Sequence, residues 1–295
     1  MYADNVPELP EVETIARGLD KRVAGDTVES VWIGSRNQPL KSSAAVIAAT
    51  LAGKRVVRVH RMGKNIVFDL EGEARWSDTK IVRHASRGQT MRASSLRTPQ
   101  WIVHLGMTGR MVVSEPADEI AKHTHLIAKL VSGRELRFID PRMFGKLSIH
   151  FGGFDPGGVE PLEVSEERFV ALFRGRKTPI KSALLNQKLL RGVGNIYADE
   201  SLFRAGIRPR RRAAAITREQ LGKLHRAVRE VLLEAIALGG SSISDYVDAD
   251  GEEGFFQLQH RVYGRESEPC RVCKTAIRRV VLAGRSSHYC SKCQK

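Results

Sequence analysis

The sequence predicts an α+β protein of several domains: a β-rich first part with a leading helix, a helical second domain and a small C-terminal zinc-binding hairpin. Three observations predict it. Short Val- and Ile-rich runs fill the first half, apolar residues after about Gly157 recur at helical spacing, and all four cysteines stand in two pairs at the C-terminus. The predicted domain ranges are 1–152, 158–255 and 256–295. A chain of 295 residues that is 42% hydrophobic can bury cores for two domains.

A helix is predicted to begin near Pro10. Proline suits a first helical position because its missing N–H has no partner there, and Glu11 and Glu13 complement the helix dipole in the first turn. The apolar face of this helix comprises Val12, Ile15, Ala16 and Leu19.

Short strands follow, separated by Gly, Asp and Ser, as expected for a sandwich or a barrel. The predicted strands are Thr27–Ile33, Arg55–His60, Asn65–Leu70, Trp101–Leu105, His125–Val131 and Glu135–Ile139. Residues Glu73–Gln100 are polar, basic and poor in periodicity, so the sequence predicts a long surface loop there.

The second domain is predicted to be helical. Thr217 and Gln220 form a capping-box pattern, and Gly239-Gly240 ends the helix that follows. Its apolar positions are Leu221, Leu224, Val228, Leu232, Ala235 and Leu238. Upstream, Leu184–Pro209 predicts a helix, a tight turn at 192–194 and a second helix near Ile196. Asn195 stands at the expected N-cap, where it either only caps the helix or helps to seat a phosphate.

The cysteine spacing predicts one structural zinc ion. Cys270 and Cys273 are followed, after sixteen residues, by Cys290 and Cys293. Each pair supplies two sulfurs from one turn, which is typical of a tetrahedral zinc site with four cysteine ligands. The alternative is two disulfides in a secreted protein. No charged-then-apolar leader opens the chain and no apolar run has the length of a membrane span, so we expect a cytoplasmic zinc finger and no membrane partner.

Charge indicates a polyanionic partner. The chain has 48 Lys and Arg against 33 Asp and Glu, a net charge of +15 and a pI of about 10.0. A basic protein with a zinc finger and separate basic clusters is typical of nucleic-acid binding, whose affinity falls steeply with salt. The alternative is a basic protein without such a partner.

Five motifs in this order resemble the bacterial formamidopyrimidine-DNA glycosylase (Fpg/Nei) family of base-excision repair enzymes. They are Pro7–Glu13, Arg61–Lys64, His104–Gly109, the segment Leu184–Pro209 and the C-terminal finger that ends in Cys-Ser-Lys-Cys-Gln. The resemblance implies an N-terminal β-sandwich, a helix–two-turn–helix domain and a zinc-ribbon hairpin. It further implies a glycosylase and abasic-site lyase that flips a damaged base out of double-stranded DNA.

The resemblance makes Pro7 the nucleophile, through its own α-amine, and Glu8 the acid/base residue. An amine that attacks C1′ of the sugar forms a covalent imine, and a secondary amine gives a cationic iminium that promotes β- and then δ-elimination. Glu8 would protonate the ring oxygen of the sugar. From the residues alone, Pro7 reads as a helix-start residue and Glu8 as an acid that complements the helix dipole.

The sequence departs from the family pattern at its start, because Met1–Val6 precede Pro7 and an internal proline has no free amine. Three explanations are open: translation from a GUG codon at position 6, proteolytic trimming, or a homologue that is not a lyase. We favour the first, because valine stands at the one position where a GUG start would leave Pro7 terminal.

Other roles follow from the resemblance position by position. Lys64 and Arg285 match residues of the catalytic machinery that, together with Asn195, grip the phosphates beside the flipped nucleotide. Lys181 is a further candidate for DNA contact in that pocket. The residues that match those filling the space left by the flipped base are Met107, Arg142 and Phe144. Without the resemblance, Lys64 and Arg285 read as surface cations and Met107 and Phe144 as core residues.

The expected substrate is DNA that contains oxidised purines, because Ser241–Gln257 and Asp140–Gly145 resemble the guanine-specific branch. The alternatives are a relative that prefers oxidised pyrimidines, a non-catalytic damage-binding protein and a zinc-ribbon RNA-binding protein. The last would leave Pro7–Glu13 and His104–Gly109 unexplained. We expect a monomer in the bacterial cytoplasm, associated with the nucleoid.

Overall fold

The computed structural model describes residues 6–71, 98–241 and 254–295, and these fold into two compact units. Among the described residues, one unit comprises 6–11, 156–241 and 254–295, and the other comprises 12–71 and 98–155. The three predicted domain ranges divide the chain differently and stay a prediction. No helix among the described residues has the length and apolar character needed to cross a membrane.

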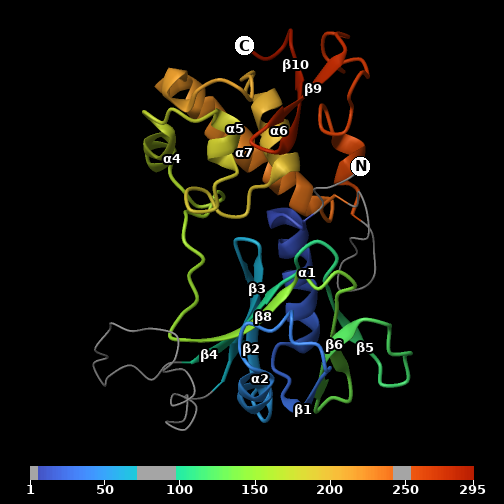
Figure 1. Ribbon diagram of the computed structural model, residues 1–295. Coiled ribbons are helices and arrows are strands. Elements are labelled where there is room, and N and C mark those ends of the chain that lie inside the picture. The colour runs from blue at the N-terminus through green and yellow to red at the C-terminus, as the bar shows by residue number, and fades with distance from the viewer. Residues whose placement is uncertain (1–5, 72–97, 242–253) are drawn as a thin grey trace. The chain divides into compact units, whose positions relative to one another are not determined.

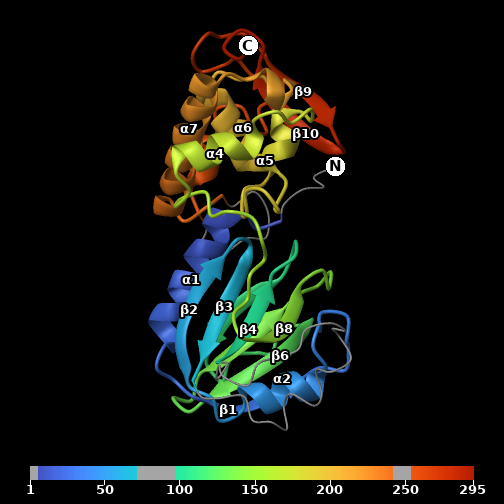
Figure 2. The same ribbon diagram turned by 90° about the vertical axis from the view of Figure 1, so that its left-hand side faces the viewer.

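The Val12–Asp155 unit is a sandwich of two antiparallel four-stranded sheets, in the orders β1-β6-β7-β5 and β2-β3-β4-β8 (Figures 1 and 2). Its strands are β1 (Val28–Ile33), β2 (Val56–Met62), β3 (Asn65–Leu70), β4 (Pro99–His104), β5 (Arg110–Ser114), β6 (Thr124–Leu130), β7 (Glu135–Ile139) and β8 (Lys146–Phe151). Side chains of both sheets share one core with helix α2 (Ala44–Leu51) and most of α1 (Leu9–Val23), and Phe68 stacks on Trp101 at 4.6 Å within it. The sandwich among the predicted alternatives is confirmed.

The other unit is helical and carries the C-terminal hairpin. Its elements are α4 (Glu166–Phe173), α5 (Ile180–Leu184), α6 (Asn195–Arg204), η2 (Ala213–Ala215), α7 (Arg218–Ala237), η3 (Phe256–Gln259), β9 (Ile277–Leu282) and β10 (Arg285–Cys290). Helix α6 packs against α7 on one side and against β10 on another (Figure 1). All its residues except Arg204 are buried, so α6 is the centre of this unit.

Several elements differ from the predictions. The predicted surface loop Glu73–Gln100 ends early, because Pro99 and Gln100 already belong to β4; residues 72–97 lie outside the described part of the chain. Helix α1 begins at Leu9, one residue before Pro10. The helix predicted from Leu184 towards the turn at 192–194 is wrong, because α5 (Ile180–Leu184) ends where that prediction begins. Strands β5 and β8 and helices α2 and α4 were not predicted, although Leu147, Ile149 and Phe151 alternate with polar residues along β8.

The capping box of α7 is confirmed. The Thr217 side chain accepts from the Gln220 N–H at 3.2 Å, and the Gln220 side chain accepts from the Thr217 N–H at 3.2 Å. Both bonds satisfy N–H groups that lack a partner inside the helix.

We predict that Thr217→Ala lowers the free energy of unfolding by about 1 kcal/mol, because it removes the acceptor for the Gln220 N–H. Urea denaturation followed by circular dichroism measures the change. Thr217→Ser keeps the hydroxyl and is the matched control. Equal stability of the alanine variant and the parent would contradict the prediction.

Candidate active site and zinc centre

The turn before α6 brings the chain's N-terminal segment against the start of this helix. Gly192 has a φ of 88°, and its carbonyl accepts from the Leu9 N–H at 3.0 Å. Gly194 is the N-cap of α6, and Asn195 is its first helical residue, so the prediction of Asn195 as the N-cap is wrong by one position. A glycine at this N-cap leaves room for another group at the helix N-terminus.

That group is the carboxylate of Glu8. Glu8 is 2% exposed, and its Oε1 accepts from the Ile196 N–H at 3.1 Å. A Cβ on Gly194 would lie 2.1 Å from Cδ of Glu8, so only glycine fits beneath the carboxylate. The unpaired N–H groups and the dipole of the helix favour a negative charge at this end. Pro7 precedes Glu8 directly and is half-buried.

Glu11 fixes the backbone around Glu8 and was not predicted as a site residue. Its Oε2 accepts from the Glu8 N–H at 2.9 Å, and its Oε1 accepts from the Ser241 N–H at 2.8 Å and from the Tyr197 hydroxyl. Burial raises the pKa of Glu11, and these hydrogen bonds oppose the rise. One buried carboxylate therefore joins α1, α6 and the residue after Gly239-Gly240. The available sequence signal was an acid three residues after Glu8, which the sequence indicated only as a complement to the helix dipole.

A buried ion pair joins α5 and α6 to the hairpin. Lys181 is 1% exposed, and its Nζ lies 2.7 Å from Oδ1 of Asp199 and donates to the Ser286 carbonyl at 2.6 Å. The second oxygen of Asp199 accepts from the His288 N–H at 2.8 Å. Asn195 donates to the Ser286 hydroxyl at 3.2 Å. These contacts hold β10 against α6.

The hairpin turn positions Arg285. Strands β9 and β10 are joined by Ala283 (φ 48°) and Gly284 (φ 77°), and Leu282 pairs with Arg285. Two consecutive positive φ values are typical of a type I′ hairpin turn. Arg285 is exposed at the first position after this turn, as the sequence predicted, and Ser286 beside it contacts Asn195. Arg285 and Asn195 therefore lie close together in one unit.

In the sandwich unit, two loops carry the other predicted site residues. Buried Asp140 accepts from the Thr108 hydroxyl at 2.6 Å and from the Gly145 N–H at 2.7 Å, which locks the loop after β4 to the loop after β7. Phe144 is 51% exposed, and the Arg142 guanidinium lies 4.9 Å from the centre of its ring. Neither Phe144 nor half-buried Met107 belongs to the sandwich core, so core packing does not account for them.

Lys64 lies in the same unit, in the two-residue turn between β2 and β3. Met62 pairs with Asn65, and Gly63 has a φ of 62°. The Lys64 carbonyl lies 3.1 Å from Nδ1 of His104, whose pKa is lowered by burial. This turn presents the motif Arg61–Lys64 at the end of the sheet.

The four cysteines form a candidate zinc centre. Their Sγ atoms all lie within 4.8 Å of one another, with 3.9 Å between Cys270 and Cys293 and 3.4 Å between Cys273 and Cys290. A tetrahedron with Zn–S bonds of about 2.3 Å has sulfur–sulfur edges of about 3.8 Å, so one zinc ion fits this cluster. Hydrogen bonds with Thr275 lower the pKa of the Cys273 thiol to about 6, whereas burial raises the pKa of the Cys290 and Cys293 thiols. Metal binds the thiolate form, so binding of zinc would release the remaining thiol protons.

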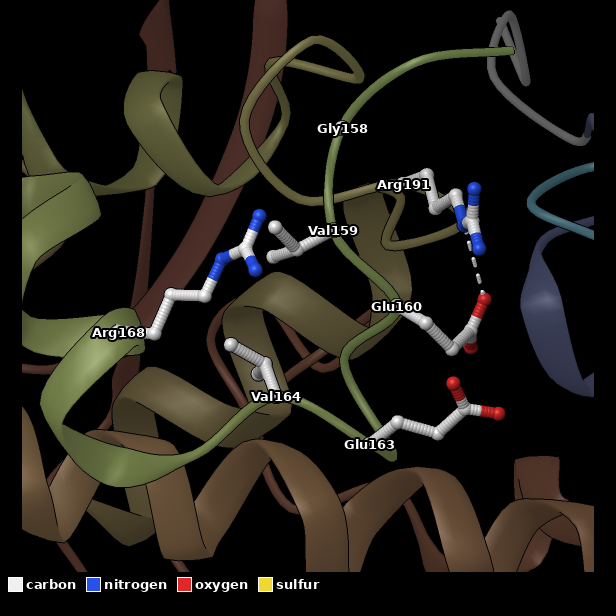
Figure 3. A pocket seen from close by; sticks show the side chains of 7 residues that line it. All are labelled: Gly158, Val159, Glu160, Glu163, Val164, Arg168 and Arg191. Carbon is white, nitrogen blue, oxygen red and sulfur yellow. Dashed lines mark hydrogen bonds and ion pairs between the residues drawn. The ribbon is translucent and has the colours of Figure 1, made fainter. Parts of the chain in front are cut away.

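A pocket in the helical unit adjoins the turn before α6, because Arg191, which lines it, directly precedes Gly192. The pocket includes none of the predicted site residues (Figure 3). It is lined by Gly158, Val159, Glu160, Glu163, Val164, Arg168 and Arg191. Glu160 pairs with Arg191 at 3.2 Å, as the dashed line shows. The Arg191 N–H donates to the Val159 carbonyl at 3.0 Å, so these residues support the turn that carries Gly192 and Gly194.

Comparison with known proteins assigns the family. Family models match residues 6–147 (formamidopyrimidine-DNA glycosylase N-terminal domain), 158–247 (formamidopyrimidine-DNA glycosylase H2TH domain) and 267–295 (zinc finger found in FPG and IleRS). The chain belongs to the formamidopyrimidine-DNA glycosylase family. The formamidopyrimidine-DNA glycosylase of Solibacter usitatus is 44% identical over 98% of this chain and 100% of its own.

Solved structures of the family have the same fold. The MutM (Fpg) protein of Thermus thermophilus is 38% identical, with a TM-score of 0.80 and 98% of each chain covered. The Lactococcus lactis Fpg in complex with a Fapy-dG containing DNA is 29% identical, with a TM-score of 0.81, over 98% of this chain and 100% of that one. The same enzyme in complex with an abasic site containing DNA has a TM-score of 0.82, at 29% identity over 98% and 99% of the two chains.

Membership of the formamidopyrimidine-DNA glycosylase family confirms several predictions. The chain is a DNA glycosylase of a family with characteristic abasic-site lyase activity, and its partner is DNA. The zinc-finger match and the sulfur cluster confirm the expected zinc centre. The roles of the individual site residues stay predictions.

We predict that Gly194→Ala displaces the Glu8 carboxylate, because the added Cβ needs the space of its Cδ. A misplacement of about 1 Å at a reacting group can cost about 100-fold in rate, so we expect a loss of that order in strand cleavage at a lesion. Gly34→Ala is the control, since its Cβ would meet nothing closer than 3.4 Å. A folded Gly194→Ala protein with the parent's rate would contradict the prediction.

We predict that His260 weakens the fold in acid. Its Nε2 lies 3.3 Å from the Ser241 hydroxyl, and burial lowers its pKa from 6.5 to about 4. Below pH 6.5 the unfolded chain binds a proton that the folded His260 does not, so stability falls as the pH drops from 6.5 towards 4. The expected loss between pH 7 and pH 5 is about 2 kcal/mol.

Chemical denaturation of the parent and His260→Gln at both pH values measures this contribution. The variant lacks the titrating ring and should lose less stability than the parent over the same interval. An identical loss in the two proteins would assign the acid sensitivity to other groups.

Proposed function

We propose that this enzyme excises oxidised purines, namely 8-oxoguanine and formamidopyrimidines, through a covalent intermediate on Pro7. The observation that carries the proposal is the Pro7-Glu8 segment bound at the N-terminus of α6, with the Glu8 carboxylate on the Ile196 N–H. This end of α6 combines an anion-binding helix terminus with a nucleophile and an acid/base residue. The Lactococcus lactis relative has been solved with Fapy-dG DNA and with abasic-site DNA.

The proposed reaction uses the secondary amine of Pro7. Its nitrogen bonds to C1′ as the glycosidic bond to the base breaks, and the departing base takes a proton from water. The Glu8 carboxylate accepts the proton that the nitrogen loses and then gives it to the ring oxygen as the C1′–O4′ bond opens. The resulting iminium withdraws electrons, so a proton leaves C2′ and the 3′-phosphate departs. A second elimination releases the 5′-phosphate, and water frees Pro7. Glu8 is close enough in sequence to act on the sugar that Pro7 holds.

The amine must be terminal for this chemistry. We propose that translation begins at the codon of Val6 and that removal of the initiator methionine leaves Pro7 first. Two observations support the proposal: the N-terminal family match begins at residue 6, and 98% of this chain aligns with the full length of the Solibacter usitatus enzyme.

We propose phosphate-binding roles for Lys64, Asn195 and Arg285. Asn195 on α6 and Arg285 on β10 lie close together, which supports their roles. The support for Lys64 is its position in the tight β2–β3 turn. The exposed pair of Arg142 and Phe144, with Met107 on the adjoining loop, is proposed to fill the space of the flipped base. Lys181 would have to leave Asp199 and the Ser286 carbonyl to reach DNA, so its present contacts favour a role in positioning β10.

The preference for purines rests on the sequence of two segments. Asp140–Gly145 lies in the locked loop of the sandwich unit. Of Ser241–Gln257, residues 242–253 lie outside the described part of the chain. We further propose that the enzyme acts as a monomer in the bacterial cytoplasm, on nucleoid DNA, and that its domains are 1–152, 158–255 and 256–295. The bacterial source of its relatives and its net charge of +15 support that location.

The test is borohydride trapping. Protein expressed from its native locus is incubated with a duplex that contains 8-oxoguanine opposite cytosine, reduced, and analysed by intact mass. We expect a covalent adduct whose mass lacks Met1–Val6, because only a terminal Pro7 can form the imine. Pro7→Gly, made with the same start, keeps a terminal amine and tests whether the secondary amine matters.

Three results would overturn parts of the proposal. Lesion binding without an adduct, with Met1–Val6 retained, would favour a non-catalytic damage-binding protein. An adduct that retains Met1–Val6 would move the nucleophile away from Pro7. Faster trapping on thymine glycol than on 8-oxoguanine would favour the pyrimidine-specific alternative.

A further inference from the structure

Two segments of the helical unit carry a group of cations outside the proposed active site. The segment 174–181, which runs from the end of α4 into α5, and the segment 207–218, which ends at the first residue of α7, contain no Asp or Glu. They lie side by side: the Ile180 N–H donates to the Arg211 carbonyl at 2.7 Å, the Ala213 N–H to the Thr178 carbonyl at 3.0 Å and the Ala214 N–H to the Arg176 carbonyl at 2.8 Å. Backbone hydrogen bonds therefore hold the two basic segments together.

The cations of these segments differ in their contacts. Arg176 donates to the Leu172 carbonyl, Lys181 pairs with Asp199, and Arg218 interacts electrostatically with Glu167. Arg208 donates to the carbonyls of Gln294 and Ser291, both at 2.8 Å, and Arg211 donates to the Ala215 carbonyl at 2.7 Å. These two arginines have structural contacts. Arg174, Lys177, Arg210 and Arg212 are exposed, and none of their side chains has an ion pair or hydrogen bond to another described residue. We call these four residues the basic surface.

Like charges held together by a fixed backbone repel one another and lower the stability of the fold. Two other exposed cations of this unit have acidic partners: Lys223 lies 2.8 Å from Glu219, and Arg226 lies 2.9 Å from Glu166. The basic surface has no acid in either of its segments. Such an arrangement suits a polyanion, whose phosphates neutralise the charges and release counterions.

Position favours DNA as that polyanion. The basic surface adjoins α5, where the Lys181 N–H contacts the Pro209 carbonyl at 3.4 Å and the Lys181 ammonium holds the Ser286 carbonyl beside Arg285. Arg208 ties the second segment to the C-terminal end of the zinc hairpin. The cations thus lie in the same unit as Asn195 and Arg285, beside the hairpin.

We propose that Arg174, Lys177, Arg210 and Arg212 form a second phosphate-binding surface for duplex DNA, beyond the phosphates that flank the lesion. The inference rests on the proposed function, since it extends the DNA contact of that site. This second surface should give the enzyme affinity for undamaged duplex DNA of any sequence, because contacts to phosphates do not depend on the identity of the bases.

The experiment measures the salt dependence of binding to an undamaged duplex. For Arg210→Ser with Arg212→Ser, we expect the slope of log K against log[salt] to become shallower by about 1.8, since each lost phosphate contact contributes about 0.9. Arg174→Ser with Lys177→Ser should change the slope similarly and is an independent check. Thermal melting by circular dichroism establishes that each variant is folded.

The matched control is Lys223→Ser with Arg226→Ser. It removes the same charge from exposed positions of the same unit, but these cations have acidic partners. We expect the control to keep the parent's slope and its rate of lesion cleavage. Shortening the duplex stepwise, by about half a helical turn of about 5 base pairs each time, should abolish the difference between parent and variant once the second surface has no DNA to bind.

Two results would overturn the proposal. The first is a slope of log K against log[salt] that is the same in the parent and in both folded basic-surface variants. A change of slope no larger than that of the control variant would count equally. The other is an equal loss of binding on duplexes of every length, because it would indicate a general charge effect. Adduct formation by the parent enzyme on 8-oxoguanine is measured separately, so failure of the proposed function is distinguishable from failure of this inference.

Discussion

The helical unit depends on one contact, between the Glu8 carboxylate and the N-terminus of α6. A buried carboxylate needs donors, and the helix supplies them where its own N–H groups lack partners. The contact requires glycine at position 194. Because Pro7 directly precedes Glu8, the contact also places Pro7 near the same helix terminus. Glu11 then fixes the Glu8 backbone by accepting a hydrogen bond from the Glu8 N–H. The geometry of the N-terminal segment thus follows from the need to give one buried carboxyl group a hydrogen-bond donor.

Helix α6 uses a second buried acid to hold the hairpin. Asp199 lies one turn after Asn195 and so faces the same side of the helix, where it meets both the Lys181 ammonium and the His288 N–H. Breaking such a pair by removing one partner leaves an uncompensated charge in the interior, which is strongly unfavourable. Gln294, between the zinc knuckle and the Ile207 carbonyl, adds a further link. The zinc centre and α6 therefore support the position of β10 from opposite ends.

Much of the architecture could be predicted from the sequence because its signals are local. The capping box at Thr217, the paired cysteines and the Val-rich strands each report on a few neighbouring residues, and all three are present in the structure. Strand β8 follows strict alternation and was missed, whereas α2 is apolar nearly throughout, so its periodicity gives no signal. The one-residue error at Asn195 arose because its side chain suits an N-cap, although a glycine was needed there to admit Glu8.

The site was harder to predict, because its supporting residues are distant in sequence. Nothing near Glu11 indicates that it accepts from Ser241, 230 positions later, and Asp140 reads as a loop residue until its contact with Thr108 is known. Lys181 was a candidate for DNA contact, and it is among the most buried side chains. Residues of a recognised motif could be found from the sequence, but the acids that hold them in place are brought to them only by the fold.

The burial of α6 has a consequence for motion. Every residue from Asn195 to Phe203 is buried, and the helix is bounded by α7, β10 and the N-terminal segment. Its amides can exchange with solvent only when those neighbours separate, so their hydrogen-exchange rates should approach those of global unfolding of this unit. The helix terminus that bears Glu8 is therefore set on the slowest-opening part of the unit, while Arg285 lies at an exposed hairpin turn that can adjust to a ligand.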